Sequence, residues 1–128
     1  MTDGMRGLEW VRLDTAWPRN PKVLQLVASR GWKQLVIYTA SLCYAAEHGT
    51  DGWIPAAALP FIHGTAADAQ RLVDVGLWIT LPDIDGWEIK DYLQHQPSSA
   101  EVAQRRRTAS EKARSAAEKR WRKPGDVR

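Results

Sequence analysis

The hydrophobic positions in the first half of the chain follow the spacing of helices. Behind Gly31, apolar residues recur at intervals of three and four, which predicts a helix that ends at His48 and Gly49. Asn20 followed by Pro21 is typical of a helix start, so a first helix is expected over residues 22–29. The expected buried face of the longer, central helix comprises Trp32, Leu35, Val36, Leu42, Cys43 and Ala46, widened by Ile37, Tyr38 and Ala45.

Short strands are expected on both sides of these helices. Residues 10–13 predict one strand, and residues 53–54 can pair as another. Apolar and polar positions alternate over residues 78–81 and 87–89, on either side of a turn at 82–86. This alternation predicts a β-hairpin. On its first strand, Trp78 and Thr80 share one face, and Ile79 and Leu81 share the other.

Two short helices are expected directly before this hairpin. Residues 55–62 predict the first, which Pro60 should tighten or break because proline lacks a backbone donor. Thr65 and Asp68 have the spacing of a capping box, and an apolar stripe follows them as far as Gly76. Two short helices joined by a glycine turn and followed by a hairpin predict a winged helix-turn-helix. The fold class is therefore mainly α with a small β-hairpin.

A second kind of sequence begins near Pro97. We expect residues 1–96 to form the winged-helix domain and residues 97–128 a basic extension. Ser98 and Glu101 form a capping box, and no helix breaker follows until Pro124. A helix of about 25 residues would be about 37 Å long. Its apolar seam is formed by Val102, Ala109, Ala113 and Ala116, which bury too little surface to anchor it strongly.

Charge is divided unequally between these two parts. Residues 1–96 hold 8 Lys and Arg against 11 Asp and Glu, a net of −3, whereas residues 97–128 hold 10 against 4, a net of +6. A basic terminal segment is typical of a protein that neutralises phosphates, although a solvated, partly disordered tail is the alternative. With 10 basic residues in the segment, nucleic-acid contact is favoured.

Several stretches together resemble a known family. They are residues 10–14, 38–45, 50–54, 72–78 and 86–92, and the tail ending Lys119-Arg120-Trp121. Across roughly residues 8–122 the chain resembles small winged-helix proteins of phages that infect actinobacteria, which are related to the N-terminal domains of phage replication initiators. The resemblance implies DNA binding, often near replication genes. Longer relatives continue beyond the basic tail. The resemblance therefore does not imply, for these residues, a function that needs a downstream effector domain.

Two sets of residues are candidates for DNA contact. In the second helix of the helix-turn-helix, Gln70 and Arg71 can read base edges, although Asp68 and Asp74 stand beside them and the wing turn carries Asp83 and Asp85. The alternative is a structural or protein-contacting helix. The second set lies in the basic extension and comprises Arg105, Arg106, Arg107, Lys112, Arg114, Lys119, Arg120, Trp121, Arg122 and Lys123. Its alternative is a solvated helix supported by Glu101–Arg105 and Glu118–Arg122 pairs.

The remaining residue types narrow the function. Core packing is expected for most of the other tryptophans (Trp10, Trp17, Trp32, Trp53, Trp78 and Trp87), and Cys43 is expected to be a buried thiol. His48, His63 and His95 lack ligand spacing, so neither a metal nor a cofactor is expected. No catalytic motif is visible, which makes an enzyme the least favoured class.

These observations lead to one main hypothesis with two alternatives. We expect a non-enzymatic protein that binds double-stranded DNA in phage replication or transcriptional control. The first alternative is an interaction module whose acidic winged-helix surface binds a host or phage protein. The second is a homodimer paired through the alanine seam. The sequence contains no apolar run of membrane-spanning length and begins without a signal-peptide pattern, so the host bacterial cytoplasm is the expected location.

Overall fold

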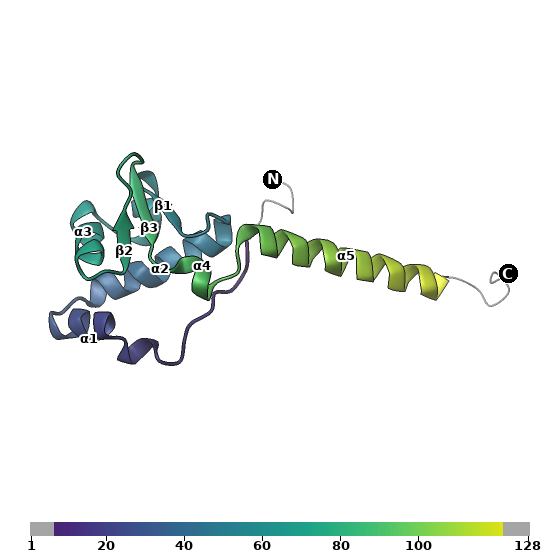
Figure 1. Cartoon of the computed structure of the whole chain (residues 1–128), viewed down its shortest axis with the longest axis horizontal. Coiled ribbons are helices and arrows are strands. Elements are labelled where there is room, and N and C mark those ends of the chain that lie inside the picture. Colours follow the sequence, from purple (N-terminus) through teal and green to yellow (C-terminus); the bar gives the residue numbers. More distant parts are fainter. Residues whose placement is uncertain (1–6, 122–128) are drawn as a thin grey trace.

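A computed structural model describes residues 7–121 of the chain (Figure 1). Residues 7–96 form a packed body, which we call the winged-helix body, and a long helix projects from it. The elements in chain order are η2 (Trp17–Arg19), α1 (Pro21–Ala28), α2 (Trp32–His48), β1 (Trp53–Pro55), η3 (Ala56–Ile62), α3 (Ala66–Asp74), β2 (Trp78–Thr80), β3 (Gly86–Ile89), α4 (Tyr92–His95) and α5 (Ser99–Trp121).

A small antiparallel sheet joins the hairpin to the middle of the chain. Its strand order is β1-β3-β2, with Ile54 opposite Trp87 and Ile79 opposite Glu88. Gly86 is required where β1 pairs with the start of β3, because a Cβ atom there would lie 2.5 Å from the Ile54 carbonyl oxygen. The sheet, η3, α3 and the β2–β3 wing complete a winged helix-turn-helix, so the predicted fold class is confirmed.

The core lies between α2, α3 and the inner face of the sheet. Its fully buried side chains come from distant parts of the sequence, because each amphipathic element buries only one face. The largest of them are Trp78, Leu26, Ile37, Ile54, Ile62, Leu72 and Ile89. Trp17 stacks on Tyr38 with a ring-centroid distance of 5.0 Å, which covers the α2 side of this core. The body therefore has a single hydrophobic centre.

The predicted helix ends are confirmed by their hydrogen bonds. The Asn20 side chain accepts from the Lys22 backbone N–H at 2.8 Å, with Pro21 as the first helical residue. Gly49 ends α2 in the left-handed conformation at φ 64°. Pro60 lies within η3, a 3-10 helix, as expected of a residue that tightens a helix. Local sequence thus determines where these helices begin and end.

The predicted strand at residues 10–13 is wrong. This segment forms no strand ladder, and the backbone groups of Arg12 bond to a side chain instead. The backbone N–H groups of Gly7 and Leu8 donate to the last carbonyls of α2, at 2.8 and 2.9 Å. The Gln96 side chain both accepts from the Arg12 N–H and donates to the Arg12 carbonyl. Gly7 and Leu8 therefore bond to the C-terminal end of α2, and Arg12 bonds to Gln96, so this part of the chain does not extend the sheet.

The predicted buried face of α2 is also wrong in part. Leu42 and Ala46 are buried and Leu35 is half-buried, but Trp32 and Val36 are 59% and 57% exposed and Cys43 is exposed. Polar side chains are buried in their place, because each has a hydrogen-bond partner there. Gln34 donates to Asp68 at 2.8 Å, and the Ser41 hydroxyl donates to the Tyr38 carbonyl at 2.6 Å. Cys43 is thus an exposed thiol.

The tryptophans divide differently from the prediction as well. Trp78 is buried, and Trp17 and Trp87 pack against the core. Trp10, Trp32 and Trp53 are 47%, 59% and 39% exposed, so core packing for most of these residues is wrong. A tryptophan next to apolar residues in the sequence is still exposed when no other helix or strand packs against its side of the chain.

Candidate nucleic-acid interface

The first candidate site lies on α3, the second helix of the helix-turn-helix. Thr65 and Asp68 form the predicted capping box, in which each side chain accepts from the other residue's backbone N–H. Asp68 is 5% exposed, and Lys33 contacts it at 2.9 Å. Burial by itself raises the pKa of Asp68, but hydrogen bonds from Lys33, Thr65 and Gln34 outweigh it and lower the pKa to about 2. This carboxylate is a structural anion that fixes α3 to α2.

Arg71, one of the two predicted base-reading residues, is engaged inside the body. Its guanidinium donates to the Ser29 carbonyl at 2.7 Å, to the Ser29 hydroxyl at 2.5 Å and to the Gln34 side chain at 3.1 Å. These bonds tie α3 to the junction of α1 and α2. A guanidinium held in this way has few donors left for a base edge.

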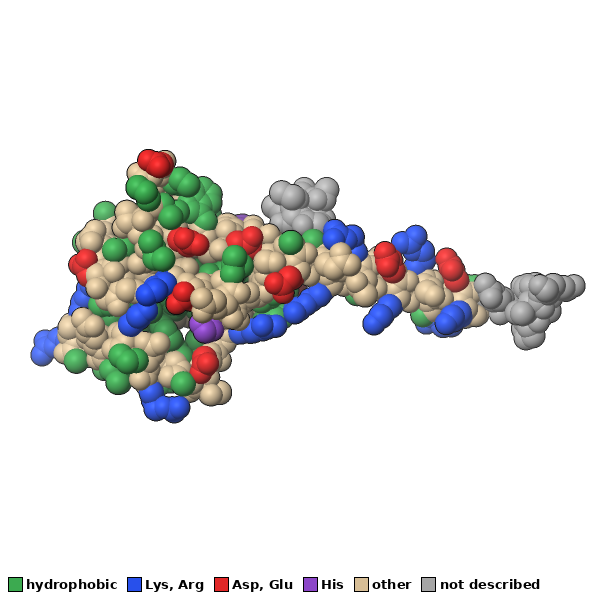
Figure 2. All heavy atoms as spheres, in the orientation of Figure 1, with side chains coloured by type: hydrophobic (Ala, Val, Ile, Leu, Met, Phe, Trp, Pro, Cys, Tyr) green, Lys and Arg blue, Asp and Glu red, His purple; other side chains and the backbone are tan. Residues whose placement is uncertain are grey.

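Gln70 is exposed but bonded within its own helix, because its amide donates to Asp74 at 2.8 Å. The outward side of α3 therefore presents a glutamine–aspartate pair and no free cation among the described side chains. The wing is also acidic, with Asp83 and Asp85 on either side of the exposed Ile84. Figure 2 shows acidic side chains at the tip of the hairpin. Groove docking through α3 and the wing is poorly matched to phosphate.

The second candidate site is the projecting helix α5, whose distal part packs on nothing within residues 7–121 (Figure 1). Val102 is its one buried residue. The exposed basic side chains are Arg105, Arg107, Lys112, Arg114, Lys119 and Arg120. Trp121 is 84% exposed at the end of the described helix. Arg122 and Lys123 lie outside the described residues.

Basic side chains occupy two opposite edges of α5, as Figure 2 also shows. At about 100° per residue, the predicted stripe of Arg105, Lys112 and Lys119 falls on one edge. Arg107 and Arg114 fall about 180° away by the same geometry. Ala109, Ala113, Ala116 and Ala117 fill one face between these edges, and Glu111 and Glu118 lie on the other. One face of the helix between the basic edges is therefore small and apolar, and the opposite face is acidic.

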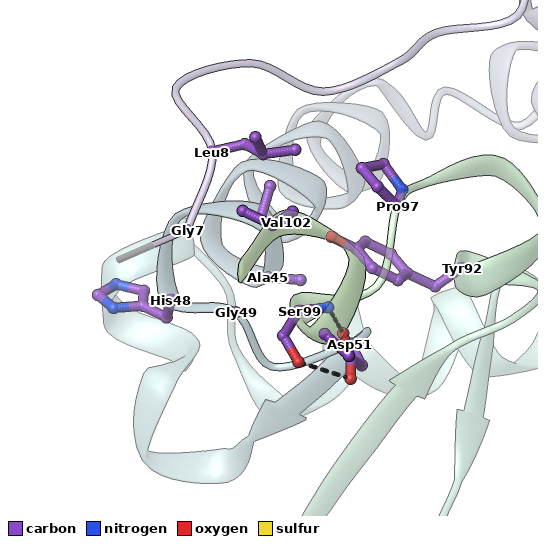
Figure 3. Close-up of a pocket in the computed structure, with 12 residues that line it drawn as sticks. Gly7, Leu8, Ala45, His48, Gly49, Asp51, Tyr92, Pro97, Ser99 and Val102 are labelled. Carbon is purple, nitrogen blue, oxygen red and sulfur yellow. Dashed lines mark hydrogen bonds between the residues drawn. The ribbon is translucent and has the colours of Figure 1, made fainter. Parts of the chain in front are cut away.

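The start of α5 is anchored on the body (Figure 3). Asp51, in the turn behind α2, accepts from the Ser99 backbone N–H at 2.7 Å and from the Ser99 hydroxyl at 3.1 Å. Within the predicted capping box, the Ser98 hydroxyl accepts from the Glu101 N–H at 3.1 Å. Sequence reasoning missed Asp51, whose only local signal is a Thr-Asp-Gly turn, because its partner lies 48 residues away.

Tyr92, Val102 and Leu8 surround this anchor and line a pocket of about 320 Å³ (Figure 3). Burial, with a smaller contribution from Asp51, raises the pKa of Tyr92 to about 12, so its hydroxyl stays protonated at neutral pH. Arg106, predicted as a DNA contact, donates to the Gly7 carbonyl and is half-buried. The first turns of α5 thus serve attachment, and the later turns carry exposed cations, of which Arg107 donates to Gln104 at 2.6 Å.

The described residues contain no group of three or more His, Cys, Asp or Glu side chains placed to hold a metal ion. No helix in this part of the chain is long and apolar enough to cross a membrane.

Comparisons with protein-family models, with curated proteins and with solved structures found no match to this chain. The resemblance to phage winged-helix proteins therefore stays a prediction.

Proposed function

We propose that this chain is a non-enzymatic DNA-binding protein in which α5 supplies most of the affinity and the winged-helix body sets the orientation of α5. The observation that carries the proposal is the projection of α5 from the body, with six exposed Arg and Lys side chains and little packing beyond Arg106. A use in phage DNA replication or transcriptional control belongs to the same proposal.

The arrangement of residues around α5 supports a position in the major groove of a duplex. This groove is about 12 Å wide and admits one α-helix, with phosphates along both walls. The two basic edges of α5 match the two walls. Its alanine face is small enough to approach the base edges, and Glu111 and Glu118 then point to solvent. Arg120 lies on the alanine side, where a guanidinium can reach a base.

The proposal is tested by fluorescence anisotropy of a labelled duplex, titrated with the full chain over a salt series. A triple variant, R105Q/K112Q/K119Q, removes one basic edge. The logarithm of the binding constant should then depend less steeply on the logarithm of salt concentration, by about 0.9 per lost phosphate contact and so by about 2.7 in total. The control, R19Q/R30Q/K90Q, removes the same charge from exposed positions of the body and should leave the slope unchanged.

A second pair of variants separates groove insertion from contact along the backbone. Ala113→Leu enlarges the alanine face without changing charge, and should weaken binding if this face approaches the bases. Ser115→Leu, on the side nearer the glutamates, is the matched control and should bind as the unchanged chain does. Equal binding by both variants would contradict groove insertion. Absence of duplex binding at low salt would overturn the whole proposal.

A second candidate function is a protein-interaction module that uses the wing. Ile84 and Ile79 are 52% and 41% exposed, and two aspartates flank Ile84 at the wing tip. An apolar tip between carboxylates is suited to binding a basic host or phage protein. In this candidate function the wing makes the contact, and α3 has a structural role because Arg71 is bonded to Ser29 and Gln34. Failure of the chain to bind duplex DNA would favour this candidate.

A further inference from the structure

An apolar stripe runs along the outer side of α2. We define the α2 stripe as Trp32, Val36, Ala40 and Cys43. Trp32 and Val36 are 59% and 57% exposed, Cys43 is exposed and Ala40 is half-buried. Spacings of three and four residues place all four side chains on one side of the helix. All of them except Ala40 belong to the face that the sequence predicts to be buried.

Two aromatic side chains border the C-terminal half of this stripe. Phe61, from η3, is 77% exposed and lines an open groove of about 710 Å³ together with Ala40 and Cys43. Trp10, from the N-terminal segment, is 47% exposed and lies near Cys43 on the other side. Phe61 and Trp10 thus line two separate hollows that meet at Cys43, and both add exposed apolar surface beside the stripe.

The apolar area of this surface is comparable to the largest apolar patch of a typical monomer. Three aromatic side chains of about 200 Å² each, exposed by roughly half or more, present on the order of 350 Å² before Val36 is added. The largest apolar patch of a typical monomer is about 300–600 Å² and often has a function. A standard interface buries about 800 Å² per partner. The stripe therefore has enough apolar area for the centre of an interface, and polar residues around it would have to supply the remaining contact area.

We propose that the α2 stripe is a two-fold interface at which two copies of this chain pair their α2 helices antiparallel. Charge complementarity is the first reason. Lys33 precedes Ala40 by seven residues and Glu47 follows it by seven, and both side chains are largely exposed at 58% and 74%. A two-fold axis at Ala40 therefore places each Lys33 opposite the partner's Glu47. The contact that Lys33 makes with Asp68 leaves further ammonium hydrogens for this pair.

Residue size is the second reason. Ala40 lies at the proposed crossing point, where a small side chain lets the helix axes approach to within the usual 8–10 Å. Val36 of each copy then packs toward Cys43 and Tyr44 of the other. Antiparallel pairing also places each positive helix N-terminus beside a negative C-terminus. The apolar stripe, its charged ends and its small centre all fit a second copy of the same helix.

This pairing also places the two α5 helices. Each α5 starts beside the C-terminal end of α2, where Asp51 holds Ser99. An antiparallel α2 pair therefore puts the two basic helices at opposite ends of the dimer. This surface is distinct from the alanine seam of α5, and the dimer does not depend on DNA binding.

The first experiment measures mass by sedimentation velocity of the full chain from about 1 to 500 µM, a range that brackets a micromolar dissociation constant. The expected result is a monomer–dimer equilibrium. Val36→Glu places a charge in the stripe and should weaken the dimer by about tenfold or more. Leu24→Glu, at a 54% exposed position of α1, is the matched control and should leave it unchanged. A monomer at every concentration, or equal weakening by both variants, overturns the proposal.

The second experiment tests the register. In a Cys43→Ser background, Ala40→Cys places the two thiols at the two-fold axis, and mild oxidation should give a disulfide-linked dimer. Leu24→Cys in the same background should stay monomeric under the same conditions. If the chain dimerises but Ala40→Cys fails to cross-link faster than Leu24→Cys, the antiparallel α2 register is wrong.

Discussion

The winged-helix body and α5 both contain helices that start at local capping signals, yet they are held in place by different forces. In the body, side chains from distant segments bury one another, as Leu26, Leu72 and Trp78 do. In α5, Val102 is the one buried residue, and the rest of the helix depends on capping and intrinsic propensity. The fold can therefore tolerate change along most of α5, which leaves the sequence there free to carry charge.

The largest difference in stability between the two regions should appear when a tryptophan is replaced by alanine in each. Trp78→Ala empties a site that is 1% exposed, and should lower the free energy of unfolding by about 3–5 kcal/mol. Trp121→Ala, at an 84% exposed position, should change it by less than about 0.5 kcal/mol. Urea unfolding followed by circular dichroism measures both. A large effect of Trp121→Ala would show that α5 packs on the body.

The next effect belongs to Asp68 and depends on pH. Its folded pKa of about 2 lies below the ordinary aspartate value of 3.8, so the ionised form stabilises the fold above the unfolded pKa. This contribution, on the order of 2 kcal/mol, should disappear as pH falls from about 5 through 2. Asp68→Asn should therefore be clearly destabilising at pH 7 and much less so at pH 2.5. An equal loss at both pH values would contradict the ionic role.

Arg71 tests whether α3 serves structure or DNA contact. Arg71→Gln removes the bonds to Ser29 and Gln34, and should cost about 1 kcal/mol of stability because the site is partly open to solvent. Duplex affinity, measured at a temperature where the variant is folded, should change by less than about twofold. A tenfold loss of affinity without a loss of stability would place Arg71 at the DNA.

The smallest effect concerns the joint between the two regions. Asp51 has φ 56°, and Asp51→Gly keeps this left-handed conformation while removing the cap on Ser99. Loss of a helix N-cap costs about 1 kcal/mol. Faster hydrogen exchange should appear in the first turns of α5, with core amides of the body unchanged. Asp51→Asn retains an acceptor oxygen and should show a smaller change.

Most elements of the fold were predictable because their signals are local. Asn20-Pro21, the Thr65–Asp68 capping box, Gly49 and the hairpin alternation each act within a few residues, and each is confirmed. In the candidate site, the basic character of α5 was equally visible in the sequence. Its weak packing was expected too, because the alanine seam buries little, but its attachment through Asp51 was not, since Asp51 and Ser99 lie 48 residues apart.

The sequence by itself determined where most of the helices and strands form and how charge is divided between body and tail, because capping, periodicity and net charge need only neighbouring residues. The tertiary structure decided which side of α2 is buried, because that helix is apolar on several sides and Gln34 finds partners in α3. It also decided that residues 10–13 pair with Gln96 and that Arg71 bonds to Ser29 across 42 positions. Such contacts depend on which distant groups meet once the core has formed, and no local pattern records them.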